Sequence, residues 1–211
     1  MHSRVAAVIF DFEGTLVDFQ WRLAEAEAQL RAAFASLGYG TTGNYAQLWN
    51  AAASLAMRDG RWAALRSRLG PIYDRWDADA STRWSARAGA GELLHALADR
   101  GLRTGMVTNI GRASLSNALA RLGFDDRLAP VVSRDDVDFL KPRPEGILRV
   151  LSDWKLSPQE ALFVGDSRAD VLAARAAGVR VAIVRGGECD ESEFDALPPD
   201  RMVSRLEEIA R

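Results

Sequence analysis

The sequence predicts an α/β fold: an open, parallel sheet flanked by helices, with a helical insertion near the start of the chain. Three observations support this prediction. Short, mainly apolar runs recur along the chain, helix-like segments follow two of them, and one long segment without a convincing strand interrupts the alternation. Such apolar runs are typical of strands that are buried on both faces, as the strands of a parallel sheet are.

The expected strands and helices alternate as a parallel sheet requires. The strands are residues 5–10, 102–107, 161–164 and 179–184. Helix-like segments follow the second and third strands, at residues 112–122 and 168–177, and each is stopped by a glycine, Gly123 and Gly178, where a left-handed cap is expected. Because open α/β sheets bind ligands beyond the carboxyl ends of their strands, the residues after each strand are the first candidates for a site.

The segment from about residue 19 to residue 87 reads as several helices separated by glycine-containing turns. Apolar residues repeat there at helical spacing, at Leu23, Leu30, Phe34 and Leu37. The segment also holds five of the six tryptophans: Trp21, Trp49, Trp62, Trp76 and Trp84. We favour an interpretation in which these rings form the core of a small bundle. The alternative is that one or two line a substrate pocket, where a ring beside Arg22, Arg58 or Arg66 could hold an organic anion.

The composition restricts the expected partners and compartment. The 211 residues carry a formal net charge of −2, so there is no broad basic field and we expect no nucleic-acid partner. The single cysteine, Cys189, rules out an internal disulfide, which favours a reducing, cytoplasmic compartment. The first apolar run is too short to span a bilayer, so we expect no membrane partner.

Two acids follow the first strand, in the stretch FDFEGT: Asp11 directly, and Glu13 two residues later. An aspartate at the end of a buried strand can attack a phosphoryl group as a nucleophile or bind a hard divalent cation. Residue i+2 of an extended chain returns to the same side, so Glu13 can face the same cleft and pass a proton to a leaving oxygen. Taken alone, the two acids could equally be a surface cluster.

Polar residues also follow the later strands. The hydroxyl of Thr108, with neighbouring backbone N–H groups, could bind phosphate oxygens near the start of a helix, although an ordinary helix cap would have the same sequence. Lys141 precedes a proline, which excludes a helix at that residue and stiffens the loop. An ammonium there suits the charge that a nucleophile and a phosphoryl group would share, and a solvated loop lysine is the alternative.

Asp166 follows the third strand, and Asp170 lies one helical turn further on. A pair of acids beside a phosphate is costly unless a cation lies among them, because like charges repel. Carboxylate oxygens are ligands that Mg²⁺ accepts, so this pair predicts Mg²⁺ as a cofactor.

Taken in order, the motifs DFEGT, VTN, LKP and GDSRAD resemble the four motifs of the haloacid dehalogenase-like hydrolase superfamily. The resemblance covers about two thirds of the chain, and within the superfamily the chain looks most like phosphoglycolate phosphatase-type proteins. It implies a Rossmann-like α/β core domain formed by residues 1–16 and 90–211. Residues 17–89 would then form an inserted α-helical cap domain.

The resemblance also implies roles for the motif residues. Asp11 becomes the expected nucleophile, Thr108 a phosphate ligand and Lys141 the lysine that neutralises charge. Asn109 and Arg143 are candidates for substrate contacts, with surface polar residues as the alternative interpretation.

The implied metal site takes Asp11, Asp166 supported by Asp170, and the backbone carbonyl of Glu13. Phosphatases of this superfamily usually carry Asp at the position of Glu13. Glu keeps an acid there, but a displacement of about 1 Å in a reacting group can cost ~10²-fold in rate. We favour an active enzyme in which Glu13 acts as the catalytic acid and base.

These inferences predict a phosphoric monoester hydrolase: an Mg²⁺-dependent phosphatase that hydrolyses a small phosphorylated metabolite through an aspartyl-phosphate intermediate. One alternative is a phosphosugar mutase of the same superfamily. The other is a catalytically impaired binding or regulatory protein in which Glu13 marks lost activity. We expect a monomer or homodimer whose partner is a small phosphorylated substrate.

Overall fold

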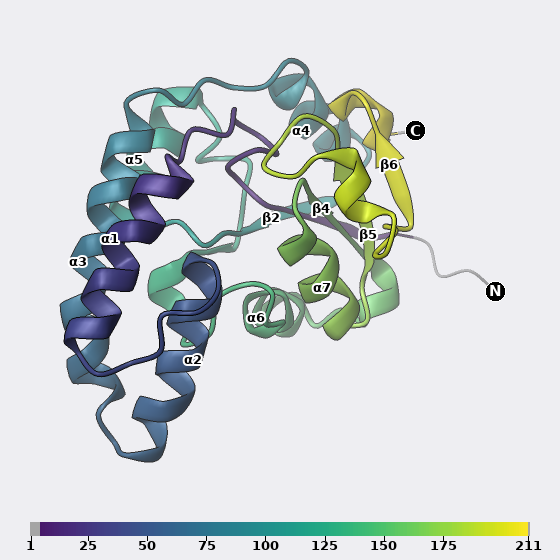
Figure 1. The fold of residues 1–211 in the computed structure, drawn as a ribbon. Helices are drawn as coiled ribbons and strands as arrows, with labels where there is room; N and C mark the ends of the chain where they lie inside the picture. Colours follow the sequence, from purple (N-terminus) through teal and green to yellow (C-terminus); the bar gives the residue numbers. More distant parts are fainter. Residues whose placement is uncertain (1–4, 211) are drawn as a thin grey trace.

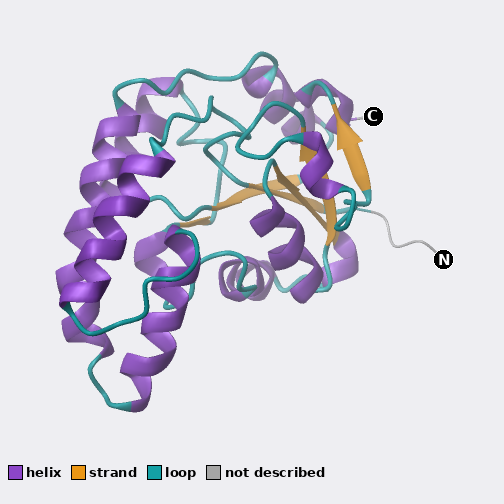
Figure 2. Cartoon of the chain, viewed as in Figure 1, coloured by secondary structure: helices purple, strands orange, loops and turns teal. Residues whose placement is uncertain are grey.

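The computed structural model describes residues 5–210, and within them six strands form one sheet in the order β3-β2-β1-β4-β5-β6. Every neighbouring pair of strands is parallel. The strands are β1 (Ala7–Phe10), β2 (Arg103–Val107), β3 (Val131–Val132), β4 (Ala161–Gly165), β5 (Arg180–Val184) and β6 (Arg201–Val203). This sheet and its flanking helices (Figure 2) confirm the predicted Rossmann-like α/β fold.

β1 lies in the middle of the sheet, between β2 and β4. Its last residue, Phe10, pairs with Met106 of β2 and with Val164 of β4, so the three strands end at nearly the same level. All four residues of β1 are buried. The residues that follow these strands therefore leave the sheet together at one edge.

Helices cover the sheet on two sides, and Figure 1 shows α6 and α7 below it and α4 above it. α4 and α6 contact β2, while α7 contacts β4 and β5. Gly123 and Gly178, which follow α5 and α7, have φ of 70° and 74°, as the predicted left-handed caps require. These helices are α4 (Ala90–Asp99), α5 (Arg112–Leu122), α6 (Glu145–Trp154) and α7 (Arg168–Ala176), with short 3-10 helices η1 (Arg134–Asp136), η2 (Pro158–Glu160), η3 (Glu191–Phe194) and η4 (Leu206–Ala210).

The segment between β1 and α4 is helical, as predicted, and forms the long arm at the left of Figure 1. It contains α1 (Leu23–Ser36), α2 (Tyr45–Arg58) and α3 (Trp62–Ser81). α2 begins at a capping box, in which Asn44 accepts from the Gln47 N–H and the Gln47 side chain accepts from the Asn44 N–H. None of the helices in the described residues is long and apolar enough to cross a membrane.

The tryptophans of this helical segment lie mostly in its interior. The ring of Trp49 packs edge-on against Trp62 and Tyr73, with centroid distances of 5.2 and 5.0 Å. The bundle-core interpretation therefore fits Trp49 and Trp62. Each indole N–H also has an acceptor: Trp21 donates to Asp77, Trp49 to the Asp138 carbonyl, Trp62 to the Asp138 carboxylate, Trp76 to Gln29 and Trp84 to Glu13.

A buried ion pair joins the helical segment to the rest of the chain. Asp77 of α3 and Arg134, which follows β3, are 0% and 1% exposed, and their Oδ2 and Nη1 atoms lie 2.6 Å apart. Asp77 also accepts hydrogen bonds from the Trp21 indole at 3.0 Å and from the Gly111 N–H at 2.9 Å. The Arg134 guanidinium lies 5.3 Å from the ring centroid of Tyr73. One aspartate of α3 thus binds groups from three separate parts of the chain.

Candidate active site

Asp11 stands at the carboxyl end of β1, where the chain leaves the sheet in a tight turn. Its N–H donates to the Val164 carbonyl at 2.8 Å, which fixes its backbone against β4. The turn passes through Gly14, whose φ of +82° is in the left-handed region. A Cβ on Gly14 would lie 2.1 Å from Asp166 Oδ2, so only glycine lets the turn approach Asp166 this closely.

Lys141 reaches the same place from its loop. Its Nζ lies 2.6 Å from Asp11 Oδ1 and 2.7 Å from Asp170 Oδ1, and the side chain is 5% exposed. Burial alone lowers the pKa of Lys141, but the charges of Asp11 and Asp170 outweigh burial and raise it. The ammonium is therefore charged, and it links the acid of the first strand to an acid of α7.

Two asparagines hold the backbone of the lysine loop. Asn109 accepts from the Lys141 N–H at 3.0 Å and donates to the Lys141 carbonyl at 3.3 Å. Asn50 of α2 accepts from the Leu140 N–H at 2.8 Å and donates to the Leu140 carbonyl at 2.9 Å. Consecutive residues of the loop are thus each held by a side-chain amide, one from the end of β2 and one from α2.

Three buried acids converge next to the ammonium. Asp11, Asp166 and Asp170 each offer a carboxylate oxygen, and these oxygens all lie within 4.8 Å of one another. Burial raises the pKa of Asp11 to about 6, although Lys141 opposes the shift, and burial with the charge of Asp170 raises the pKa of Asp166 well above its usual value. An all-oxygen donor set with excess negative charge fits a hard divalent cation such as Mg²⁺.

Hydrogen bonds orient the two acids of the GDSRAD motif. Asp170 Oδ2 accepts from the Asp166 N–H at 3.1 Å, and from the N–H and hydroxyl of Ser167 at 3.0 and 2.8 Å. Asp166 accepts from the Thr15 hydroxyl at 3.0 Å and from the Glu188 N–H at 2.6 Å. These donors stabilise the carboxylates and fix the direction in which they face.

Glu13 is buried and held by two donors. Its Oε1 accepts from the Trp84 indole and from the Gln20 N–H, both at 2.8 Å. Burial raises the pKa of Glu13 to about 7, and these two hydrogen bonds oppose the shift. A carboxyl group that titrates near neutrality can both give and take a proton, which suits general acid and base catalysis.

The four predicted motifs meet around one cavity. Thr108 and Asn109 are buried at the end of β2, and the Thr108 hydroxyl accepts from the Ile110 N–H at 3.2 Å. Asp166 and Asp170 lie next to the cavity. It is lined by Asp11, Glu13, Phe19, Tyr45, Thr108, Asn109, Ile110, Lys141, Ser167, Ala169 and Glu188.

Arg143 is the one predicted site residue that the structure places away from this cavity. It is exposed, and its guanidinium carbon lies 5.7 Å from the ring centroid of Phe139. Its contact with substrate stays a prediction.

Two polar residues of the cavity from outside the predicted motifs are Glu188 and Tyr45. Burial, with the charges of Asp170 and Asp11, raises the pKa of Glu188 to about 8. The sequence does carry a signal for Glu188, because it is an acid shortly after the strand β5. The residue before it is Gly187, and a Cβ on Gly187 would lie 2.2 Å from Asp166 Oδ2. Tyr45 begins α2, and nothing in the sequence indicates that this helix start lies over the sheet edge.

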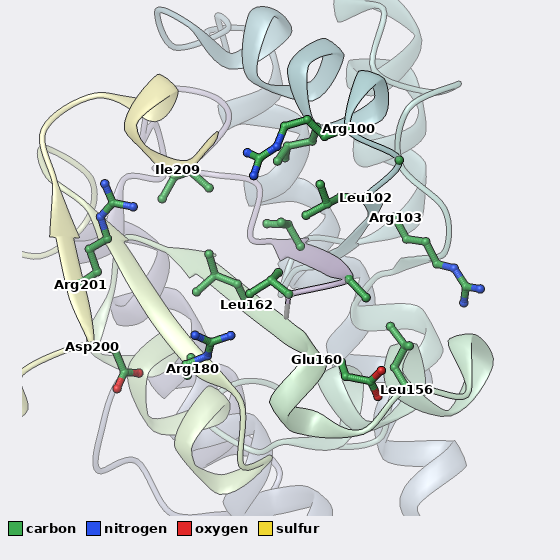
Figure 3. A pocket seen from close by; sticks show the side chains of 15 residues that line it. Arg100, Leu102, Arg103, Leu156, Glu160, Leu162, Arg180, Asp200, Arg201 and Ile209 are labelled. Carbon is green, nitrogen blue, oxygen red and sulfur yellow. The ribbon is translucent and has the colours of Figure 1, made fainter. Parts of the chain in front are cut away.

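A larger hollow, of about 870 Å³, lies at the opposite ends of the strands (Figure 3). Its lining includes the first residues of β2, β5 and β6, namely Arg103, Arg180 and Arg201. None of the predicted site residues lines it. Size alone therefore does not locate the chemistry in this molecule.

The parallel sheet, the strand-end aspartate and the lysine between buried acids define an α/β enzyme whose centre lies beyond the carboxyl ends of its strands. The chain belongs to the haloacid dehalogenase-like hydrolase family, whose family model matches residues 5–178. The resemblance inferred from the four motifs is thus confirmed, as is the predicted enzyme class, a phosphoric monoester hydrolase.

Named relatives extend this comparison along the chain. A phosphoglycolate phosphatase of Cupriavidus necator is 32% identical, and the match covers 96% of this chain and 90% of that protein. An N-acetylmuramic acid 6-phosphate phosphatase of Pseudomonas aeruginosa is 30% identical, with 87% and 83% covered. A crystal structure of a hydrolase from Pseudomonas syringae shares the fold, with a TM-score of 0.70, 23% identity and coverage of 97% and 95%.

Proposed function

We propose that this protein is an Mg²⁺-dependent phosphatase that hydrolyses a small phosphate monoester through an aspartyl-phosphate on Asp11. The observation that carries the proposal is the position of Lys141, whose Nζ contacts both Asp11 at 2.6 Å and Asp170 at 2.7 Å. A carboxylate beside a buried ammonium supports this role, because the positive charge would offset the negative charge of an incoming phosphoryl group. The relatives, two of which bear phosphatase names, support the same chemistry.

In the first step, a carboxylate oxygen of Asp11 attacks phosphorus and the bond between phosphorus and the leaving oxygen breaks. Glu13 donates its proton to that oxygen, so the alcohol leaves neutral. In the second step, Glu13 takes a proton from water, the water oxygen attacks phosphorus, and the bond to Asp11 breaks. Phosphate leaves, and both carboxyl groups return to their starting states.

The remaining residues hold the phosphoryl group and its charge. Lys141 neutralises negative charge shared by Asp11 and the phosphoryl oxygens, and the Thr108 hydroxyl binds one of those oxygens. Asp11, Asp166, Asp170 and the backbone carbonyl of Glu13 would hold Mg²⁺. When bound, the ion supplies further positive charge at the phosphoryl oxygens.

We also propose the predicted division into a cap domain, residues 17–89, and a core domain, residues 1–16 and 90–211, of which residues 1–4 and 211 lie outside the described part of the chain. The three helices of the cap contact one another, and Tyr45 of α2 lines the catalytic cavity. The cytoplasmic compartment and the monomeric or dimeric state stay predictions.

The test is release of inorganic phosphate from a panel of phosphorylated metabolites, with Mg²⁺ and with the metal chelated. We expect hydrolysis of some members that requires Mg²⁺ and disappears in the Asp11→Asn variant. Transfer of phosphate between positions of a hexose phosphate would instead favour the phosphosugar mutase. Absence of turnover on the whole panel, together with binding of a protein partner, would favour the impaired regulatory protein.

A further inference from the structure

The catalytic cavity adjoins a second, small cavity on the side of the helical cap. This second cavity is lined by Glu13, Phe19, Trp21, Leu23, Tyr45, Asn109 and Ile110, most of which also line the first. The two cavities therefore form one cleft. If phosphate is held between Lys141 and Thr108, the rest of a substrate extends toward the second cavity.

The second cavity has mostly apolar walls. Aliphatic and aromatic surface is supplied by Phe19, Leu23 and Ile110. The rings of Trp21 and Tyr45 also line the cavity, and their centroids lie 5.0 Å apart. The Trp21 N–H is already bonded to Asp77. Such walls bind an apolar or aromatic group by burying it from water.

The neutral polar groups of this cavity come from two side chains. The Tyr45 hydroxyl accepts from Asn109 Nδ2 at 3.4 Å. Both side chains line both cavities, so both face the place where phosphate and leaving group meet. They suit an uncharged hydroxyl or ether of the substrate.

The side chains that line the cleft offer an anionic leaving group no free positive charge. Among the described residues that line the two cavities, Lys141 is the only cation, and it is bonded to Asp11 and Asp170. Glu13 and Glu188 add two further carboxyl groups. A substrate carboxylate would lose its water there without gaining a free side-chain cation as partner, which is costly.

The arginines considered for an organic anion are all engaged elsewhere and line neither cavity. Arg22 binds the Asp79 carboxylate at 2.8 Å. Arg58 donates to the Ser54 carbonyl, and Arg66 donates to the carbonyls of residues 134 and 135. Trp21 lines the second cavity, but no arginine does, so the pairing of ring and arginine in the alternative interpretation is not found there.

We propose that the cleft selects phosphate monoesters whose leaving alcohol is uncharged and presents an apolar or aromatic surface, and that it rejects esters with a carboxylate next to the phosphate. The proposal rests on the phosphatase function proposed above and names its substrate class. It separates this chain from its relatives named for phosphoglycolate.

The first experiment compares kcat/KM with Mg²⁺ for a matched pair, 2-phosphoglycolate and 2-hydroxyethyl phosphate, together with phenyl phosphate. We expect the two neutral esters to exceed 2-phosphoglycolate by at least about tenfold, with phenyl phosphate the better of the two. Equal or faster hydrolysis of 2-phosphoglycolate overturns the selectivity and leaves the phosphatase intact. Hydrolysis of none of the three, nor of any member of the metabolite panel, ends the phosphatase proposal and this one with it.

The second experiment places a cation in the second cavity. Leu23 is half-buried at the start of α1, so Leu23→Arg and the uncharged control Leu23→Gln can both be accommodated. We expect Leu23→Arg to raise the ratio of kcat/KM for 2-phosphoglycolate over 2-hydroxyethyl phosphate by about tenfold, and Leu23→Gln to leave the ratio unchanged. The same ratio in both variants would show that the leaving group lies elsewhere and would overturn the proposal.

Discussion

Asp77 and Arg134 form an ion pair in which both side chains are buried, and Asp77 Oδ2 lies 2.6 Å from Arg134 Nη1. Replacing Asp77 by Ala leaves the Arg134 charge buried with only the half-exposed Asp74 beside it. We expect the free energy of unfolding to fall by about 3–5 kcal/mol, measured by urea denaturation.

Asp79, two residues further along α3, provides the matched control. It pairs with Arg22 and Arg83 at the surface. Because surface pairs contribute little, Asp79→Ala should cost at most about 1 kcal/mol. Equal decreases in the free energy of unfolding of the two variants would mean that the buried Asp77 pair stabilises the fold no more than a surface pair.

Gly14→Ala should impair both folding and activity. The left-handed backbone costs an alanine about 1–2 kcal/mol, and its Cβ would also collide with Asp166 Oδ2. Gly60 has a similar φ of +66° but open space around it, so Gly60→Ala carries the backbone cost alone. We expect phosphatase activity to survive in Gly60→Ala and to be lost in Gly14→Ala. Full activity of Gly14→Ala would argue against a role for the close approach to Asp166.

Glu13→Gln tests the proton transfer. An amide oxygen can still accept from Trp84 and from the Gln20 N–H, so the fold should hold, but the amide cannot exchange a proton. We expect kcat to fall by roughly 10²-fold or more, measured on the best substrate of the panel. Unchanged kcat would remove Glu13 from the acid and base role.

Lys141→Arg tests whether a compact ammonium is needed. Lys141 fits between two carboxylates at 2.6 and 2.7 Å, whereas a planar guanidinium is larger and prefers to bind one carboxylate in a forked geometry. The chain has only one other lysine, Lys155, which ends α6. We expect Lys141→Arg to lower kcat/KM by roughly 10²-fold and Lys155→Arg to leave it unchanged. Similar activity of both variants would contradict a specific need for lysine at position 141.

The fold was predictable where strands are buried on both faces. The four mainly apolar runs became β1, β2, β4 and β5, with shifts of one or two residues at their ends. β3 and β6 are two and three residues long and lie at the edges of the sheet, and such short segments carry no periodic signal. Their positions depend on pairing with strands distant in the sequence.

The acidic centre was predictable for a related reason. Parallel strands that end at the same level bring the following residues together, so Asp11 and Asp166 had to be neighbours once the sheet was inferred. The cap side of the cleft was not predictable. Tyr45 reaches it because α2 packs on the core through Trp49, which donates to Asp138, and Asn50, which binds Leu140. Those contacts are set by tertiary packing rather than by local spacing.

The paired amide contacts of Asn50 and Asn109 make the lysine loop a shared component of cap and core. A displacement of α2 away from the sheet must either carry Leu140 along or give up both of its bonds to Asn50. Lys141 directly follows Leu140 in the chain. The position of its ammonium therefore depends on whether α2 is packed against the loop. In the proposed mechanism, the charge of Lys141 is thereby coupled to the packing of α2 against its loop.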